Sequence, residues 1–169
     1  MNLTDVKLLV DYHYWARDVM FGALDPLTAE QWTRPIESSF KSLRETVVHI
    51  YGAELLWYAR WQGDQSGWPS LDHLTDVASV RKAWSDLEEN VRGFVGRLGE
   101  PGMSRIFDYR ALNGQPTSTP FWQMLQHVVN HASYHRGQIT TMLRQLGAAP
   151  PQSMDLIGFY RLRDKDRQT

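Results

Sequence analysis

The sequence predicts an all-α fold, a four-helix bundle that carries a short β-hairpin between its third and fourth helices. Apolar residues recur every three or four positions over four long stretches, as they do on the buried face of a helix. Segments rich in glycine, proline and polar residues separate these stretches. Because 169 residues suffice for one core and are few for two, we expect a single domain over residues 1–169.

The first helix is expected over residues 3–24, where Asp25-Pro26 ends it because proline cannot continue a helix. The sequence TAEQW then predicts a short turn, and residues 34–40 show no periodicity. The face that the first helix buries is formed by Val6, Leu9, Val10, His13, Tyr14, Arg17 and Met20.

The second helix is expected to begin after Ser42 and to end near Trp61. Ser42 and Glu45 match a capping box, in which each side chain accepts a hydrogen bond from a free backbone N–H of the first turn. A polar loop over residues 63–72 leads to the third helix, expected over residues 75–98. The buried stripe of the third helix consists of Val77, Val80, Trp84, Leu87, Val91, Phe94, Val95 and Leu98.

The β-hairpin is expected between residues 105–110 and 115–119, because these segments flank Asn113-Gly114, a strong signal for a tight turn. Thr119 and Pro120 match the cap and first residue of the fourth helix, which closes at Leu146-Gly147. Residues 161–169 are expected to fray. Before them lies an apolar patch that we expect to pack on the bundle, formed by Leu156, Ile157, Phe159 and Tyr160.

Composition and charge exclude several classes of function. A net charge of −1 provides no basic surplus for phosphate groups, so we expect no nucleic-acid partner. The chain has no cysteine, so any metal must be held by nitrogen and oxygen ligands. The first residues lack the pattern of a signal peptide, and nowhere do about 18 apolar residues run together. We therefore expect a cytoplasmic protein with no membrane partner.

Three histidines lie four residues apart in the fourth helix, and neighbours at this spacing can bind one ion from the same helix face. At about 100° per residue, His135 lies roughly 50° from the centre of the apolar face, His131 about 90° and His127 about 130°. The pair His131 and His135 therefore faces inward, and His127 faces outward. Chance is an alternative explanation, because histidines are often core or surface residues. Ala132 stands where the metalloprotease motif HExxH requires glutamate.

A facing helix must complete such a site, because ligands approach an ion from several directions. His49 in the second helix is the natural candidate, although it lies roughly 120° from the apolar centre of that helix. His13 in the first helix and Glu54, which lies directly on the apolar stripe, are competing candidates. The spacing by itself leaves these three alternatives open.

Three segments resemble the DinB-like superfamily of damage-inducible and YfiT-like bundle proteins. They are DYHYWARDVM, LRETVVHIYGAELLWYARW and, most specifically, HVVNHASYHRGQITTMLRQLG. The resemblance implies an up-down-down-up bundle, often a homodimer, with one nickel or zinc ion on three histidines. Its ligand positions match His49, His131 and His135, whereas His127 matches none.

Other residues near this pattern have candidate roles around the metal. Glu54, His13 and Gln138 are candidates for hydrogen bonding to a ligand histidine. We expect Gly137 to permit close contact between helices and Arg136 to be structural. Aromatic walls for a substrate pocket are expected from Trp15, Trp57 and Trp61, for each of which ordinary core packing is the alternative.

A three-histidine site with an open position is typical of catalytic metal centres. Some members of the superfamily use a low-molecular-weight thiol, so the resemblance implies a metal-dependent S-transferase with a small-molecule substrate and a thiol cosubstrate. One alternative is a metal-dependent hydrolase with Glu54 as general base. Another is a non-catalytic stress-response protein that binds metal or a small molecule.

Overall fold

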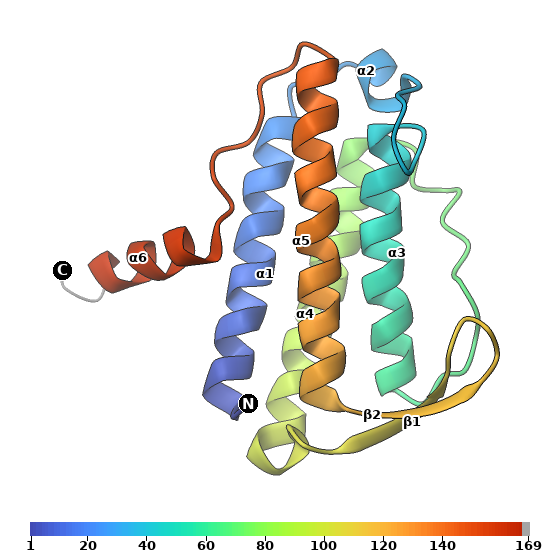
Figure 1. Cartoon of the computed structure of the whole chain (residues 1–169), viewed down its shortest axis with the longest axis vertical. Helices are drawn as coiled ribbons and strands as arrows, with labels where there is room; N and C mark the ends of the chain where they lie inside the picture. Colours follow the sequence, from blue (N-terminus) through green and yellow to red (C-terminus); the bar gives the residue numbers. More distant parts are fainter. Residues whose placement is uncertain (167–169) are drawn as a thin grey trace.

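The computed structural model describes residues 1–166, and most of them lie in helices (Figure 1). The bundle predicted from the sequence is formed by α1, α3, α4 and α5. The elements are α1 (Leu3–Leu24), α2 (Ala29–Thr33), α3 (Leu43–Trp61), α4 (Val77–Gly102), β1 (Ile106–Arg110), β2 (Pro116–Pro120), α5 (Phe121–Gln145) and α6 (Leu156–Asp166).

The four long helices run up, down, down and up, which is the topology that the resemblance implies (Figure 1). Both α1 and α3 pack against α4 and α5, so α1 and α3 occupy opposite corners of the bundle. Because α3 and α4 are parallel, the chain between them must return along the length of the bundle. Residues 62–76 make this return on the outside of α3 (Figure 1).

The start of α3 and the end of α4 each differ in part from the prediction. The hydroxyl of Ser42 accepts a hydrogen bond from the backbone N–H of Glu45 at 3.1 Å, as predicted. The carboxylate of Glu45 instead accepts from the N–H of Lys41 at 3.0 Å, so only half of the capping box forms. Asp76 caps α4, and Gly99, with φ of 62°, kinks this helix where the sequence predicted its end.

The predicted hairpin is present as antiparallel strands β1 and β2, with Ile106 opposite Pro120. Its turn contains Gly114 at φ of 81°, a conformation that favours glycine. The predicted cap of the next helix is wrong by one residue, because Thr119 and Pro120 belong to β2. The backbone N–H of Phe121, at the start of α5, donates a hydrogen bond to the carbonyl of Arg105, which directly precedes β1, at 2.9 Å.

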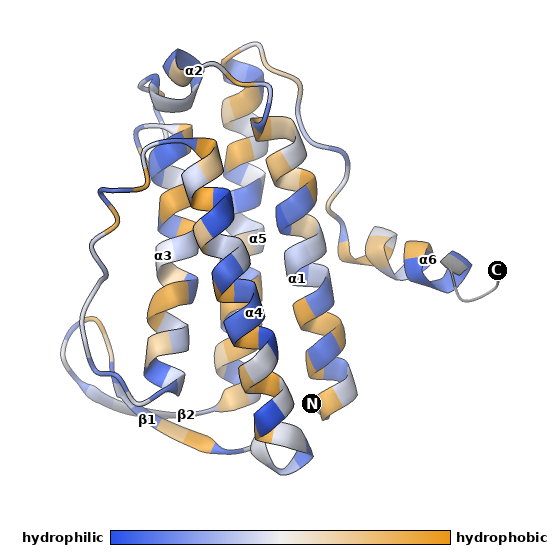
Figure 2. Cartoon of the chain, turned by 180° about the vertical axis from the view of Figure 1, so that it is seen from behind, coloured by the Kyte–Doolittle hydropathy of each residue, from blue (hydrophilic) through white to orange (hydrophobic). Residues whose placement is uncertain are grey.

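The apolar faces of the long helices meet in the centre of the bundle, and hydrophilic residues alternate with them on the outside (Figure 2). The tail differs from the prediction, because residues 161–166 belong to α6; residues 167–169 lie outside the described part. Phe159 packs on the bundle as expected, whereas Ile157 is 56% exposed. In residues 1–166, no helix has the length and apolar character to cross a membrane.

Candidate metal centre

The structure brings His49 of α3 together with His131 and His135 of α5. The Nε2 atom of His131 lies 3.0 Å from Nε2 of His49 and 3.1 Å from Nε2 of His135. One ring nitrogen of each residue lies within 4.8 Å of the other two. The candidate metal centre therefore joins two helices through residues more than 80 positions apart.

This donor set fits one divalent ion. Two nitrogen ligands about 2.1 Å from the same ion are about 3.0–3.4 Å apart at octahedral or tetrahedral angles. Two of the three separations, 3.0 and 3.1 Å between Nε2 atoms, lie in that interval. Three imidazoles do not fill a four- or six-coordinate shell, so the set resembles a catalytic site more than a structural one.

Gln138 fixes the orientation of the His135 ring. Nδ1 of His135 lies 2.7 Å from Oε1 of Gln138, and an amide oxygen can only accept a hydrogen bond. The proton is therefore on Nδ1, which leaves the lone pair of Nε2 directed toward the other two histidines. The amide nitrogen of Gln138 donates to the hydroxyl of Ser39 at 3.0 Å and holds the amide in place.

The electrostatic environment keeps two of the rings uncharged at neutral pH. Burial lowers the pKa of His49 to about 4, and the nearby His135 ring lowers it further. Burial likewise lowers the pKa of His131 to about 4, with smaller contributions from His135, His49 and His127. A metal ligand must be deprotonated at its donor nitrogen, so the site is prepared for a cation.

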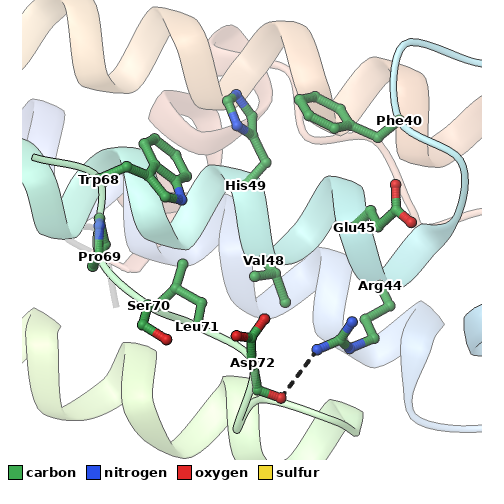
Figure 3. Close-up of a pocket in the computed structure, with 10 residues that line it drawn as sticks. All are labelled: Phe40, Arg44, Glu45, Val48, His49, Trp68, Pro69, Ser70, Leu71 and Asp72. Atoms are coloured by element: carbon green, nitrogen blue, oxygen red, sulfur yellow. Dashed lines mark hydrogen bonds between the residues drawn. The ribbon is translucent and has the colours of Figure 1, made fainter. Parts of the chain in front are cut away.

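Two aromatic side chains enclose the ring of His49 (Figure 3). Phe40 comes from the connection between α2 and α3, and Trp68 from the connection between α3 and α4. The ring of Phe40 lies 4.3 Å from that of His49, and the ring of Trp68 stacks on the other side at 5.4 Å and 14°. Neither residue is among the site residues predicted from the sequence. Trp68 had a signal, since a large aromatic side chain stands out in a polar, glycine-rich loop, where it is 46% exposed.

Two cavities open beside this centre and share His49 and Trp68. The first, about 570 Å³, lies between α3 and the 62–76 connection (Figure 3). The second, about 510 Å³, also reaches His131. It is lined by His49, Ala53, Leu56, Trp57, Arg60, Trp68, Tyr109, Ala111, Leu112, Asn113, His127 and His131.

The candidate hydrogen-bonding residues divide into two groups. Gln138 contacts the histidine cluster, as described above. Glu54 and His13 instead contact one another, with 2.8 Å between Oε2 and Nε2. The other hydrogen bonds of Glu54 come from Tyr14 and Trp84 at 2.6 Å each. Glu54 thus joins α3 to α1 and α4 inside the bundle, and its hydrogen-bond partners do not include the three histidines.

The candidate pocket tryptophans also separate. Trp57 lines the second cavity, and its ring lies 5.3 Å from that of the exposed His127. Trp61 is buried and stacks on Phe94 at 5.9 Å, so it is a core residue. Trp15 packs on Phe159 of α6 at 5.4 Å.

Arg136 and Gly137 follow His135 in α5, and the structure confirms the prediction for Arg136 but not for Gly137. Arg136 is buried and donates to the hydroxyl of Ser133 at 2.8 Å, a structural role as expected. The interpretation of Gly137 as a point of close helix contact is wrong, because a Cβ placed there meets no atom within 4 Å. Gly137 lies on the exposed side of α5.

The fold and the site together define a class of protein. It is an up-down-down-up helical bundle in which α3 and α5 bring three histidines together as a candidate metal centre. The chain belongs to the DinB family, whose model matches residues 1–166.

One relative agrees with this assignment, and one solved structure shares the fold. The chain is 30% identical to Protein DinB of Bacillus subtilis (strain 168), over 93% of this chain and 95% of that protein. Its fold resembles the crystal structure of a DinB-like protein from Bacillus cereus ATCC 10987, with a TM-score of 0.65 and 20% identity over 86% of this chain and 95% of that one.

Proposed function

We propose that the protein is a metal-dependent enzyme that binds one zinc or nickel ion through His49, His131 and His135 and transfers a low-molecular-weight thiol to an electrophile. The observation that carries this proposal is the convergence of three imidazole nitrogens at the edge of an aromatic-lined cavity. An ion bound there would lower the pKa of a thiol in its open position.

The residues around the centre favour thiol transfer over hydrolysis. Hydrolysis requires a general base beside the attacking water, and Glu54 lines neither of the two cavities beside the centre. Glu54, the candidate base, has both oxygens engaged by His13, Tyr14 and Trp84. In thiol transfer the sulfur bonds to the electrophilic carbon, the leaving group departs with its electron pair, and the thiol proton passes to solvent.

The side chains of the cavity would position the substrate and exclude water. Trp57 and Tyr109 meet edge to face at 5.2 Å and form an apolar wall beside His131. The chain has no cysteine, so the thiol must come from a cosubstrate. We place the enzyme in the cytoplasm, where such thiols stay reduced.

Elemental analysis of the purified, tag-free protein tests the metal. We expect about one ion per chain in the wild type and loss of the ion in His49→Ala, His131→Ala and His135→Ala. His127→Ala and the exposed His73→Ala are controls that should keep it. A wild-type protein that takes up neither zinc nor nickel would contradict the proposal.

Turnover assays separate the candidate functions once the metal is established. Consumption of thiol with a panel of electrophiles supports the transferase, and turnover of simple esters or amides without thiol supports the hydrolase. Metal binding without either activity supports the third candidate, a stress-response protein that binds metal or a small molecule.

We also propose that the protein is a homodimer. The apolar side chains that α6 leaves exposed support this proposal, because such patches are typical of interaction surfaces. They are Leu156, Ile157 and Leu162.

A further inference from the structure

Arg60, near the end of α3, is a buried cation in the wall of the second cavity. Only 7% of the residue is exposed. Its guanidinium lies 4.7 Å from the ring centre of Trp57 and 5.0 Å from that of Tyr109, which belongs to β1. Nη2 donates to the carbonyl of Arg110 at 3.0 Å. These contacts hold the planar group in one orientation beside two aromatic rings.

No carboxylate balances this charge within the described residues. Arg60 takes part in none of the ion pairs found there. The cavity that it lines contains no Asp or Glu. Buried charges in proteins are normally paired, because removing an ion from water is costly. The unpaired guanidinium therefore lacks the anion that would offset its burial.

The free N–H groups of Arg60 face accessible space. Within residues 1–166, its side chain forms one hydrogen bond, to the Arg110 carbonyl. The side-chain atoms that are fully buried without a partner belong, in the described part of the chain, to His13, Trp61 and Arg136. Those of Arg60 are thus not sealed off, and a ligand in the cavity can reach them. A guanidinium offers paired donors that match the two oxygens of a carboxylate.

The same cavity connects Arg60 with the histidine cluster. His49 and His131 line it at one end, and His127 lies between them and the aromatic pair. Burial lowers the pKa of His127, and the charge of Arg60 lowers it further. His49 and Arg60 are eleven residues apart on one helix, and an arginine side chain points back along it. A molecule that contacts both must therefore span on the order of 10 Å.

We propose that Arg60 binds the carboxylate of the thiol cosubstrate, so that this cosubstrate carries its sulfur and a carboxylate about 10 Å apart. The inference rests on the proposed function, because the three histidines define where the sulfur lies. The carboxylate pairs with the guanidinium, and the chain between the two ends packs on Trp57 and Tyr109.

Isothermal titration of the zinc-loaded protein with 8-mercaptooctanoate and its neutral amide tests this assignment. We expect the wild type to bind the acid at least about tenfold more tightly than the amide. Arg60→Gln should bind the two alike, and Arg60→Lys should recover part of the preference. Arg110→Gln removes a neighbouring charge but keeps the backbone carbonyl that accepts from Arg60, so this variant should retain the preference for the acid. The shorter 3-mercaptopropionate should show little dependence on Arg60.

Two results would overturn the assignment. Equal binding of acid and amide by the wild type removes the carboxylate site while leaving the metal centre intact. A preference that persists in Arg60→Gln places the carboxylate elsewhere, for example on the zinc ion. Thermal unfolding followed by circular dichroism establishes that each variant is folded.

The same titrations on the metal-free protein separate the two proposals. If zinc does not bind but the preference for the acid still depends on Arg60, the proposed function fails and the carboxylate site stands. If the preference is absent with and without zinc, the carboxylate site fails, whatever the metal analysis shows.

Discussion

At the scale of single residues, the candidate metal centre depends on the protonation and orientation of its rings. Gln138 is placed one turn after His135 on α5, at the spacing that brings side chains into contact. Its oxygen accepts the Nδ1 proton and prevents the ring from presenting that nitrogen to an ion. Among residues 1–166, His49 has no such amide partner, and Phe40 and Trp68 restrict its ring instead.

Replacing Gln138 by leucine should weaken zinc binding about 10- to 100-fold, because the His135 ring loses its orientation. Competition with a chromophoric chelator measures this affinity. Gln145→Leu, on an exposed position of the same helix, is the matched control and should bind zinc as the wild type does. Equal affinities for the two variants would show that Gln138 does not support the ligand.

Glu54 is a buried carboxylate whose surroundings have opposing effects on its pKa. Burial raises the pKa, but the charge of His13 and the hydrogen bonds from His13, Tyr14 and Trp84 together lower it below its ordinary value. The unfolded chain therefore binds this proton at a higher pH than the folded protein does. The resulting stabilisation is present above the unfolded pKa of about 4.5 and is lost as the pH falls below it.

Glu54→Gln should therefore change how stability depends on pH. We expect the variant to lose about 3 kcal/mol near pH 7, because a buried partner of His13 loses its charge. Between about pH 5 and pH 3, the free energy of unfolding should fall less steeply than in the wild type. Urea denaturation at several pH values measures both effects. Loss of zinc in this variant would show that Glu54 serves the metal centre after all.

At the scale of elements, α3 and the connection that follows it shape the site together. Gly52 of α3 permits this connection to lie close to the helix. A Cβ at this position would lie 2.6 Å from Cδ1 of Leu71 and 2.7 Å from Cζ2 of Trp68, both closer than atoms can approach. The stacking of Trp68 on His49 thus depends on a residue without a side chain.

Gly52→Ala should displace Trp68 from His49 and destabilise the protein by about 1–3 kcal/mol, because the side chains of Leu71 and Trp68 must move away from the added methyl group. Thermal unfolding measures the stability, and tryptophan fluorescence reports the changed packing. Gly137→Ala is the matched control, since nothing lies within 4 Å of its added Cβ. It should raise stability by up to about 1 kcal/mol through higher helix propensity. Similar effects of both substitutions would contradict the close approach at Gly52.

At the scale of the whole molecule, the topology places the functional residues and leaves α6 apart from the bundle core. Only the side of α6 that carries Phe159 packs on α1 and α5, and the rest of the helix projects from the bundle (Figure 1). Ile157 and Leu162 are about half exposed, at 56% and 48%. Apolar side chains on a projecting helix are suited to burial against a second copy of the chain.

Light scattering coupled to size exclusion should give twice the 19.6 kDa mass of the chain. Ile157→Asp should shift the mass toward the monomer, because a charge cannot be buried in an apolar interface without a partner. Leu112→Asp is the matched control on the exposed tip of the hairpin and should leave the dimer intact. A monomeric wild type would refute the homodimer.

The sequence by itself determined the four long helices, the hairpin and the pairing of His131 with His135. Each depends on signals that act over a few residues: the cap at Ser42, the turn at Gly114, and a four-residue spacing along α5. These signals place the described elements to within a few residues, and the error at Thr119 arose because strand pairing extended further than the capping pattern indicated.

Only the tertiary structure decided which side chains complete and surround the site that His131 and His135 begin. Helix periodicity placed Glu54 on the buried face of α3 and His49 far from it, and both positions are as expected. The structure shows that the buried face contacts α1 and α4, whereas the side that carries His49 turns toward α5 and is covered by connecting segments. Trp68 and Arg60 join the site through contacts with loops and strands distant in sequence. Such contacts depend on how whole elements pack, and local sequence patterns carry no information about that packing.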